Sequence, residues 1–254
     1  MAGLVEGKAG LVTGSAGGIG RATAIALARE GASVLVTDLP ARAQDGAETV
    51  RLITEAGGTA IWLAGDVTVD ADAKAAVDAA VEAFGRLDFA HNNAGIELQA
   101  TVTGTTEPEW DAIMNVNVKG VWLGLKHQID RMVAQGSGGS IVNTASLAGL
   151  MAVPSLAAYI ASKHAVVGLT KAAAVECAEH EIRVNAVCPT FVETPLTRVL
   201  LENEAIKSDI LGRTPAGRLA TPDEVAAAIT FLAGPAARMI TGTALTVDGG
   251  WTAI

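Results

Sequence analysis

The chain has 254 residues, of which half are apolar, 18% are charged and only 4% are aromatic. A composition this rich in apolar residues builds a packed core, which excludes a disordered or fibrous protein. Its 27 acidic residues outnumber its 18 basic ones and give a net charge of −9, which disfavours nucleic acid and anionic membrane surfaces as partners. Neither a signal peptide nor a membrane-spanning segment is predicted, and we expect a cytoplasmic protein.

Short β-branched runs alternate with longer Ala-rich helical patterns, which predicts βα units around a parallel sheet. The expected strands are Gly10–Thr13, Ser33–Thr37, Ala60–Ala64, Leu87–His91, Ser140–Thr144, Arg183–Val187 and Ala244–Val247. The expected helices are Ile19–Glu30, Ala71–Phe84, Glu107–Val133, Ala157–Glu179 and Pro222–Ala233. We therefore predict an α/β fold, a Rossmann-like doubly wound sheet of about seven parallel strands with helices on both faces, in a single domain over residues 1–254.

Residues 190–220 interrupt this alternation. A segment that long inside a compact domain is usually functional or carries its own helices. Its first part is apolar, which predicts a short helical lid over a substrate site; the residues concerned are Phe191, Val192, Leu196, Val199, Leu200 and Leu201.

The first expected strand leads into a glycine-rich loop, Thr13 to Gly20, directly before a helix. Glycines allow a diphosphate to approach the backbone amides at a helix N-terminus, so Gly14, Gly18 and Gly20 are predicted to bind a dinucleotide. The loop lacks the Lys-Ser/Thr pair of nucleoside triphosphate loops, which disfavours a kinase or an ATPase.

Two acidic positions after the next strands are expected at the adenosine end of the cofactor. Asp38 ends the second strand, where a carboxylate accepts hydrogen bonds from ribose hydroxyls and repels a 2′-phosphate, so NAD is the predicted cofactor. Asp66 and Val67 follow the third strand and are expected near the adenine. A cap for the helix that begins near Asp70 is the alternative role for Asp66.

The only tyrosine, Tyr159, lies four residues before Lys163, so both side chains share one face of the expected helix. A nearby cation stabilises a phenolate and lowers the phenol pKa from its usual value of about 10, which prepares it to exchange a proton with an alcohol. Ser146 follows the preceding strand, at the sheet edge where ligands bind.

Together these residues resemble the short-chain dehydrogenase/reductase family, over essentially the whole chain. Besides the glycine loop and the Tyr159–Lys163 pair, the matching positions are Asn92 to Gly95, Asn117, Ser146, Pro189, Thr194, Thr241-Gly242 and Asp248 to Gly250. Thr190 departs from the family pattern, because a glycine usually follows the proline at position 189.

The resemblance implies a role for each matching residue. Tyr159 would be the general acid/base, Ser146 would bind the substrate oxygen, and Asn117 would hold a water molecule of a proton relay. Lys163 would bind the nicotinamide ribose and lower the pKa of Tyr159. The cofactor would also contact Ile19, Asn93, Ala94, Gly95, Val116, Pro189, Val192 and Thr194.

The predicted function is hydride transfer between NAD(H) and a secondary alcohol or its ketone. Leu147, Met151 and Phe191 are expected in the substrate pocket and favour a hydrophobic or cyclic substrate. A 3-oxoacyl-thioester reductase is the alternative within enzymes, and a non-catalytic dinucleotide-binding sensor is the alternative outside them. No metal site is predicted, and the resemblance implies a homotetramer.

Overall fold

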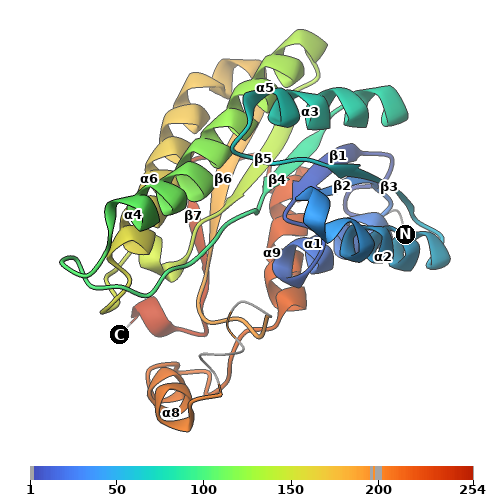
Figure 1. Ribbon diagram of the computed structural model, residues 1–254. Coiled ribbons are helices and arrows are strands. Elements are labelled where there is room, and N and C mark those ends of the chain that lie inside the picture. Colours follow the sequence, from blue (N-terminus) through green and yellow to red (C-terminus); the bar gives the residue numbers. More distant parts are fainter. Residues whose placement is uncertain (1–2, 195–196, 198–201, 254) are drawn as a thin grey trace.

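The computed structural model describes residues 3–194, 197 and 202–253. It forms a parallel sheet between two layers of helices (Figure 1). The strands are β1 Ala9–Thr13, β2 Ser33–Asp38, β3 Thr59–Ala64, β4 Phe89–Asn92, β5 Gly139–Thr144, β6 Ile182–Pro189 and β7 Ala244–Val247. Their order is β3-β2-β1-β4-β5-β6-β7 and every pair is parallel, which confirms the predicted doubly wound fold.

Helices cover both faces of this sheet. They are α1 Gly18–Arg29, α2 Ala43–Glu55, α3 Asp70–Phe84, α4 Glu107–Met114, α5 Gly120–Gln135, α6 Ala157–Glu176, α8 Glu204–Gly212 and α9 Pro222–Ala233. Figure 1 shows α3, α5 and α6 on one face of the sheet and α1, α2 and α9 on the other. Among these described helices, none is long and apolar enough to cross a bilayer.

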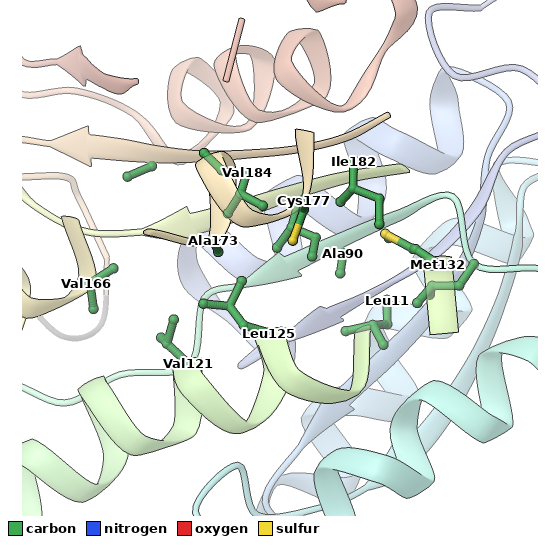
Figure 2. Close-up of a cluster of buried hydrophobic side chains, with 14 of the residues drawn as sticks. Leu11, Ala90, Val121, Leu125, Met132, Val166, Ala173, Cys177, Ile182 and Val184 are labelled. Carbon is green, nitrogen blue, oxygen red and sulfur yellow. The ribbon is translucent and has the colours of Figure 1, made fainter. Parts of the chain in front are cut away.

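The largest apolar cluster fills the space between the sheet and the layer that contains α5 and α6 (Figure 2). Leu125 of α5 and Val166 of α6 pack in it with Leu11 of β1 and Val184 of β6, and all four side chains are at most 4% exposed. Close packing of this kind resists local displacement. It therefore fixes the ends of the strands, from which the candidate site is built.

The strand order reverses between β1 and β4, which leaves a crevice at the carboxyl ends of these two strands. Side chains join the two loops across it. Thr13 Oγ1 accepts from the backbone N–H groups of Asn93 and Ala94, at 2.9 and 3.0 Å. The Asn93 amide in turn donates to the carbonyls of Thr13 and Gly14. These bonds hold the glycine loop against the Asn-Asn-Ala-Gly segment.

The sequence prediction missed α2, which lies between β2 and β3. Its buried positions are Gly46, Thr49 and Ile53, so the face toward the core carries only one large apolar residue. A Cβ on Gly46 would lie 2.1 Å from the Trp62 ring, which explains why this face carries a glycine instead of an apolar side chain. Apolar residues do recur at helical spacing in this segment, but its polar composition and the Gly46 and Thr49 on its buried face conceal the helix.

The single helix predicted from Glu107 to Val133 is wrong in one respect. The structure divides it into α4 and α5, with a π-helical turn at Asn115–Lys119 between them. A π turn inserts one residue into the helical repeat and leaves the polarity pattern nearly unchanged, so the sequence does not reveal it.

The predicted helix ends are largely confirmed. Thr221 caps α9, its Oγ1 accepting from the Glu224 N–H at 3.3 Å, and Pro222 occupies the first turn. Gly85 ends α3 with a φ of +80°. The fourth predicted helix is shorter than expected, because α6 ends at Glu176 and a short 3₁₀ turn follows.

The segment 190–220 contains α8, whose Ile210 packs with Leu219 and Trp251 at the periphery (Figure 1). The helical lid predicted from the first part of the segment falls largely on residues 195–196 and 198–201, which lie outside the described residues.

Candidate active site

A cavity of about 740 Å³ runs along the carboxyl ends of the central strands. Its size is within the range of small-molecule and cofactor sites. It brings together most of the residues predicted from the sequence: Gly14, Gly18, Ile19, Asp38, Asp66, Val67, Asn93, Ala94, Gly95, Val116, Ser146, Leu147, Tyr159, Lys163, Pro189, Phe191, Val192 and Thr194.

Three predicted residues do not line the cavity as its described walls define it. Gly20 supports the glycine loop from behind, because a Cβ there would lie 2.3 Å from the Gly14 carbonyl oxygen. Met151 packs against the peripheral cluster of Ile210, Leu219 and Trp251. The third, Asn117, is 1% exposed and lies just beneath the wall.

The glycine loop fits a diphosphate. Gly14 has a φ of +63° and approaches the Asn-Asn-Ala-Gly segment so closely that a Cβ would lie 2.8 Å from the Ala94 Cα. Gly18, with a φ of +52°, begins α1 in a backbone conformation that disfavours side chains. No acidic residue occupies the first turn of α1, so its N-terminus is free to attract an anion.

Asp38 is fixed beside this loop by two backbone donors. Its Oδ2 accepts from the Ala16 N–H at 3.1 Å and its Oδ1 accepts from the Leu39 N–H at 2.8 Å. Arg42 also lines the cavity, and a Cβ on Gly17 would lie 3.4 Å from its Nη2. The sequence suggested no arginine near Asp38, but the 3₁₀ turn at Pro40–Arg42 brings this side chain back toward the glycine loop.

Asp66 stabilises the turn that follows β3. Its Oδ1 accepts from the N–H and the hydroxyl of Thr68, at 2.9 and 2.8 Å, and so fixes the turn after β3. The N-cap of α3 is Val69, so Asp66 is not the helix cap that the sequence left as an alternative.

Tyr159, Ser146 and Lys163 meet in the inner part of the cavity. Lys163 Nζ donates to the Thr144 carbonyl oxygen at 2.9 Å and lies 5.5 Å from the centroid of the Tyr159 ring. The lysine is 4% exposed. Tyr159 and Lys163 lie four residues apart on α6, so their side chains share one face of the helix. The carbonyl at the end of β5 fixes the position of the ammonium.

Burial is the largest influence on the pKa values of Tyr159 and Lys163. It raises the pKa of Tyr159 above its usual value, the charge of Glu97 raises the pKa further, and the Ser146 hydroxyl lowers it. Burial lowers the pKa of Lys163 to about 8. The pKa of Tyr159 is therefore raised and not lowered as the spacing with Lys163 predicts, because desolvation outweighs the other contributions.

Asn117 occupies the π turn between α4 and α5. Its side chain accepts from the Ile96 N–H at 2.9 Å, donates to the Ile96 carbonyl at 2.9 Å, and lies 3.1 Å from the Ser162 hydroxyl. These contacts join the loop after β4 to α6, which carries Tyr159. Asn117 thus holds two walls of the site together, and π turns are frequent at functional sites.

Sequence reasoning missed Glu97, which follows the Asn-Asn-Ala-Gly segment and lines the cavity. It also missed the orientation of Arg42. Both residues reach the cavity through loops, so no helix or strand spacing identifies them as site residues. The one signal in the sequence is the position of Glu97, two residues after Gly95.

Comparison with known proteins agrees with this geometry. Residues 14–252 match a family model described as Enoyl-(Acyl carrier protein) reductase. The chain is 40% identical over 253 residues to a cyclohexanol dehydrogenase of Acinetobacter sp. (strain SE19), covering 99% of this chain and 98% of the relative. It is 41% identical over 253 residues to a 3-oxoacyl-[acyl-carrier-protein] reductase of Thermotoga maritima, covering 97% and 98%.

Solved structures give the same result. A putative short-chain alcohol dehydrogenase from Sinorhizobium meliloti 1021 superposes with a TM-score of 0.93 at 37% identity, covering 98% of this chain and 97% of that one. A putative 2-deoxy-D-gluconate 3-dehydrogenase from Agrobacterium tumefaciens, solved with bound NADP, has a TM-score of 0.90 at 38% identity and covers 98% of both chains. The glycine loop, the crevice and the Ser146–Tyr159–Lys163 group define a dinucleotide-dependent oxidoreductase. The chain belongs to the short-chain dehydrogenase/reductase family.

Proposed function

We propose that this enzyme interconverts a secondary alcohol and its ketone with NAD(H) as cofactor, and that the substrate is hydrophobic or cyclic. The observation that carries the proposal is the grouping of Ser146, Tyr159 and Lys163 in one cavity with the glycine loop. The similar cyclohexanol dehydrogenase supports the choice of a cyclic alcohol.

A bound nicotinamide supplies or accepts the hydride, and the side chains of this chain manage the proton. Tyr159 donates a proton to the carbonyl oxygen in reduction and takes it from the hydroxyl in oxidation. Ser146 orients that same oxygen by a hydrogen bond. Lys163 holds the nicotinamide ribose and places positive charge near the developing phenolate.

Apolar side chains around the reacting group support a hydrophobic substrate. Leu147, Val153, Leu156 and Phe191 line the cavity that also contains Tyr159. Such a wall binds a carbon ring by burial of apolar surface and offers few partners to the hydroxyls of a sugar. Segment 190–220 supplies Phe191 to this wall, and we propose that it acts as the substrate lid.

NAD as the preferred cofactor rests on Asp38, whose carboxylate is fixed beside the Ala16 amide. A carboxylate there accepts from ribose hydroxyls and repels a 2′-phosphate. Arg42 lies on the same wall, but its Nε is bonded to Asp45 at 2.8 Å, which reduces its availability to a phosphate.

A 3-oxoacyl-thioester reductase is the second candidate, favoured by the similar enzyme of Thermotoga maritima. Absorbance at the reduced-nicotinamide band, with NAD(H) and NADP(H) against cyclic alcohols, ketones and a 3-oxoacyl thioester, separates the two. We expect the highest kcat/KM with a cyclic alcohol and NAD. A higher value for the thioester would overturn the proposal, and no turnover with a bound cofactor would favour a sensor.

We also propose a homotetramer in the cytoplasm. Large aromatic side chains support self-association, since Trp110 on α4 and Trp122 on α5 are 42% and 48% exposed. Light scattering of the purified protein gives the subunit number directly, and a monomer would contradict this part of the proposal.

A further inference from the structure

One carboxylate of the cavity wall, that of Glu97, has no part in the catalytic roles described above. Glu97 follows β4 and is half-buried in the wall. The other carboxylates that the described wall contains, Asp38 and Asp66, follow β2 and β3 and belong to the expected adenosine end. Glu97 is therefore the acidic group on the side of Tyr159.

The Glu97 carboxylate lines the same cavity as the reacting groups Tyr159 and Lys163. Its charge raises the pKa of Tyr159 and contributes in the same direction to that of Lys163. Burial raises the pKa of Glu97 itself, while Gln99 and the charge of Lys163 lower it. The Gln99 side chain lowers this pKa as a hydrogen-bond partner of Glu97. Among the ion pairs of the described residues, none includes Glu97, so the other lone pairs of its carboxylate can still accept hydrogen bonds.

The neighbours of Glu97 in the cavity make this capacity significant. Gln99 is its side-chain hydrogen-bond partner and Lys163 the cation that acts on it, whereas Ile96, Leu147 and Leu156 of the same cavity wall provide no side-chain donor. A ligand that displaces water from a carboxylate without replacing its hydrogen bonds loses affinity, because an unpaired buried charge is costly. A simple apolar alcohol therefore fits the walls but not Glu97.

We propose that Glu97 accepts a hydrogen bond from a second hydroxyl of the substrate, so that the preferred substrate class is a cyclic diol or hydroxyketone. This inference rests on the proposed function, because the first hydroxyl is the one that Tyr159 and Ser146 bind. Glu97 is then a specificity-determining residue: the apolar wall selects the ring, and the carboxylate selects its second hydroxyl.

The test compares kcat/KM for cyclohexanol, the 1,2-, 1,3- and 1,4-cyclohexanediols, and the monomethyl ether of the diol that is used best. The ether retains an oxygen but loses the donor. For the parent enzyme we expect at least one diol to exceed both cyclohexanol and its own ether by about 10-fold or more, the effect of a hydrogen bond to a charged group.

Two variants assign this preference to Glu97. Glu97→Leu fills similar volume without an acceptor and is expected to reduce the diol-to-cyclohexanol ratio by about 10-fold to 100-fold. Glu97→Gln keeps an acceptor oxygen without the charge and is expected to fall between parent and leucine variant. Glu82→Gln on α3 is the matched control, since this exposed glutamate is outside the cavity wall and outside segment 190–220, and we expect it to keep the parental ratio.

The outcomes separate this inference from the proposed function. If alcohols are oxidised but no diol exceeds cyclohexanol, or if Glu97→Leu changes all alcohols by the same factor, the inference is wrong and the proposed function stands. An equal factor would show that Glu97 acts only on the pKa of Tyr159. If no alcohol of the panel is oxidised, the proposed function fails; calorimetric binding of the diols to parent and Glu97→Leu then decides the inference independently, and equal affinities overturn it.

Discussion

Cofactor preference depends on a single carboxylate whose position is now known. Asp38 Oδ2 is 3.1 Å from the Ala16 N–H of the glycine loop, so its charge lies where the adenosine ribose is expected. Two like unit charges about 4 Å apart repel by roughly 4 kcal/mol at an effective dielectric of 20. Solvent exposure and Arg42 on the same wall reduce this penalty. We expect kcat/KM to favour NAD over NADP by about 100-fold, or about 2.7 kcal/mol.

Asp38→Asn tests this reasoning, because the asparagine retains one oxygen for the Ala16 N–H and removes the charge. Its NH2 group cannot accept from the Leu39 N–H, but that loss affects both cofactors alike and leaves their ratio unchanged. The NAD-to-NADP ratio should fall by about 10-fold to 100-fold. Adding Arg42→Ala should weaken NADP use again, since this guanidinium is the nearest cation on the wall. The assay is kcat/KM for both cofactors at one ionic strength, with Asp78→Asn on the exposed face of α3 as the control. A parent that prefers NADP, or an unchanged ratio in Asp38→Asn, would refute the argument.

Three further predictions concern the inner part of the cavity. Tyr159→Phe should retain the circular-dichroism spectrum and lose about 10²-fold to 10⁴-fold in turnover, and near-parental turnover would exclude Tyr159 as the acid/base. Ser146→Ala removes the hydroxyl that lowers the Tyr159 pKa; because oxidation needs the phenolate, its pH–rate profile should move to higher pH, and an unmoved profile would limit Ser146 to binding. Among the described residues Thr190 Oγ1 is buried without a partner, so Thr190→Val should raise the melting temperature by about 2–4 °C, and a fall would reveal a partner.

The parallel sheet was predictable because its signal is local and repeated. Most strands contain β-branched residues, and glycines or capping residues mark many helix ends. α2 escaped prediction because Gly46 and Thr49 take positions on its buried face that are usually apolar. The π turn escaped because inserting one residue hardly alters the helical pattern. Elements that bury several large apolar side chains are therefore easier to find in a sequence than a polar helix that approaches the sheet through small ones.

In the site, too, the residues that lie on a helix or at the end of a strand could be predicted from the sequence. Helical spacing places Tyr159 and Lys163 on one face of α6, and the end of β2 places Asp38 beside the glycine loop. Glu97 and Arg42 reach the cavity through loops, and their positions depend on contacts between distant segments. Asn117, for example, fixes the backbone at Ile96, one residue before Glu97, from 21 positions further along the chain.

The pKa of Tyr159 shows where spacing alone misleads. A lysine four residues away predicts a stabilised phenolate, yet burial and Glu97 raise the tyrosine pKa. Burial also lowers the pKa of Lys163 to about 8, so its ammonium loses its proton more readily than an exposed lysine. Desolvation penalises the charged form of both residues, and it acts on every group placed in an apolar cavity. Activation of Tyr159 in this chain therefore depends on the groups that face its oxygen when ligands are bound, with Ser146 the neighbour that already lowers its pKa.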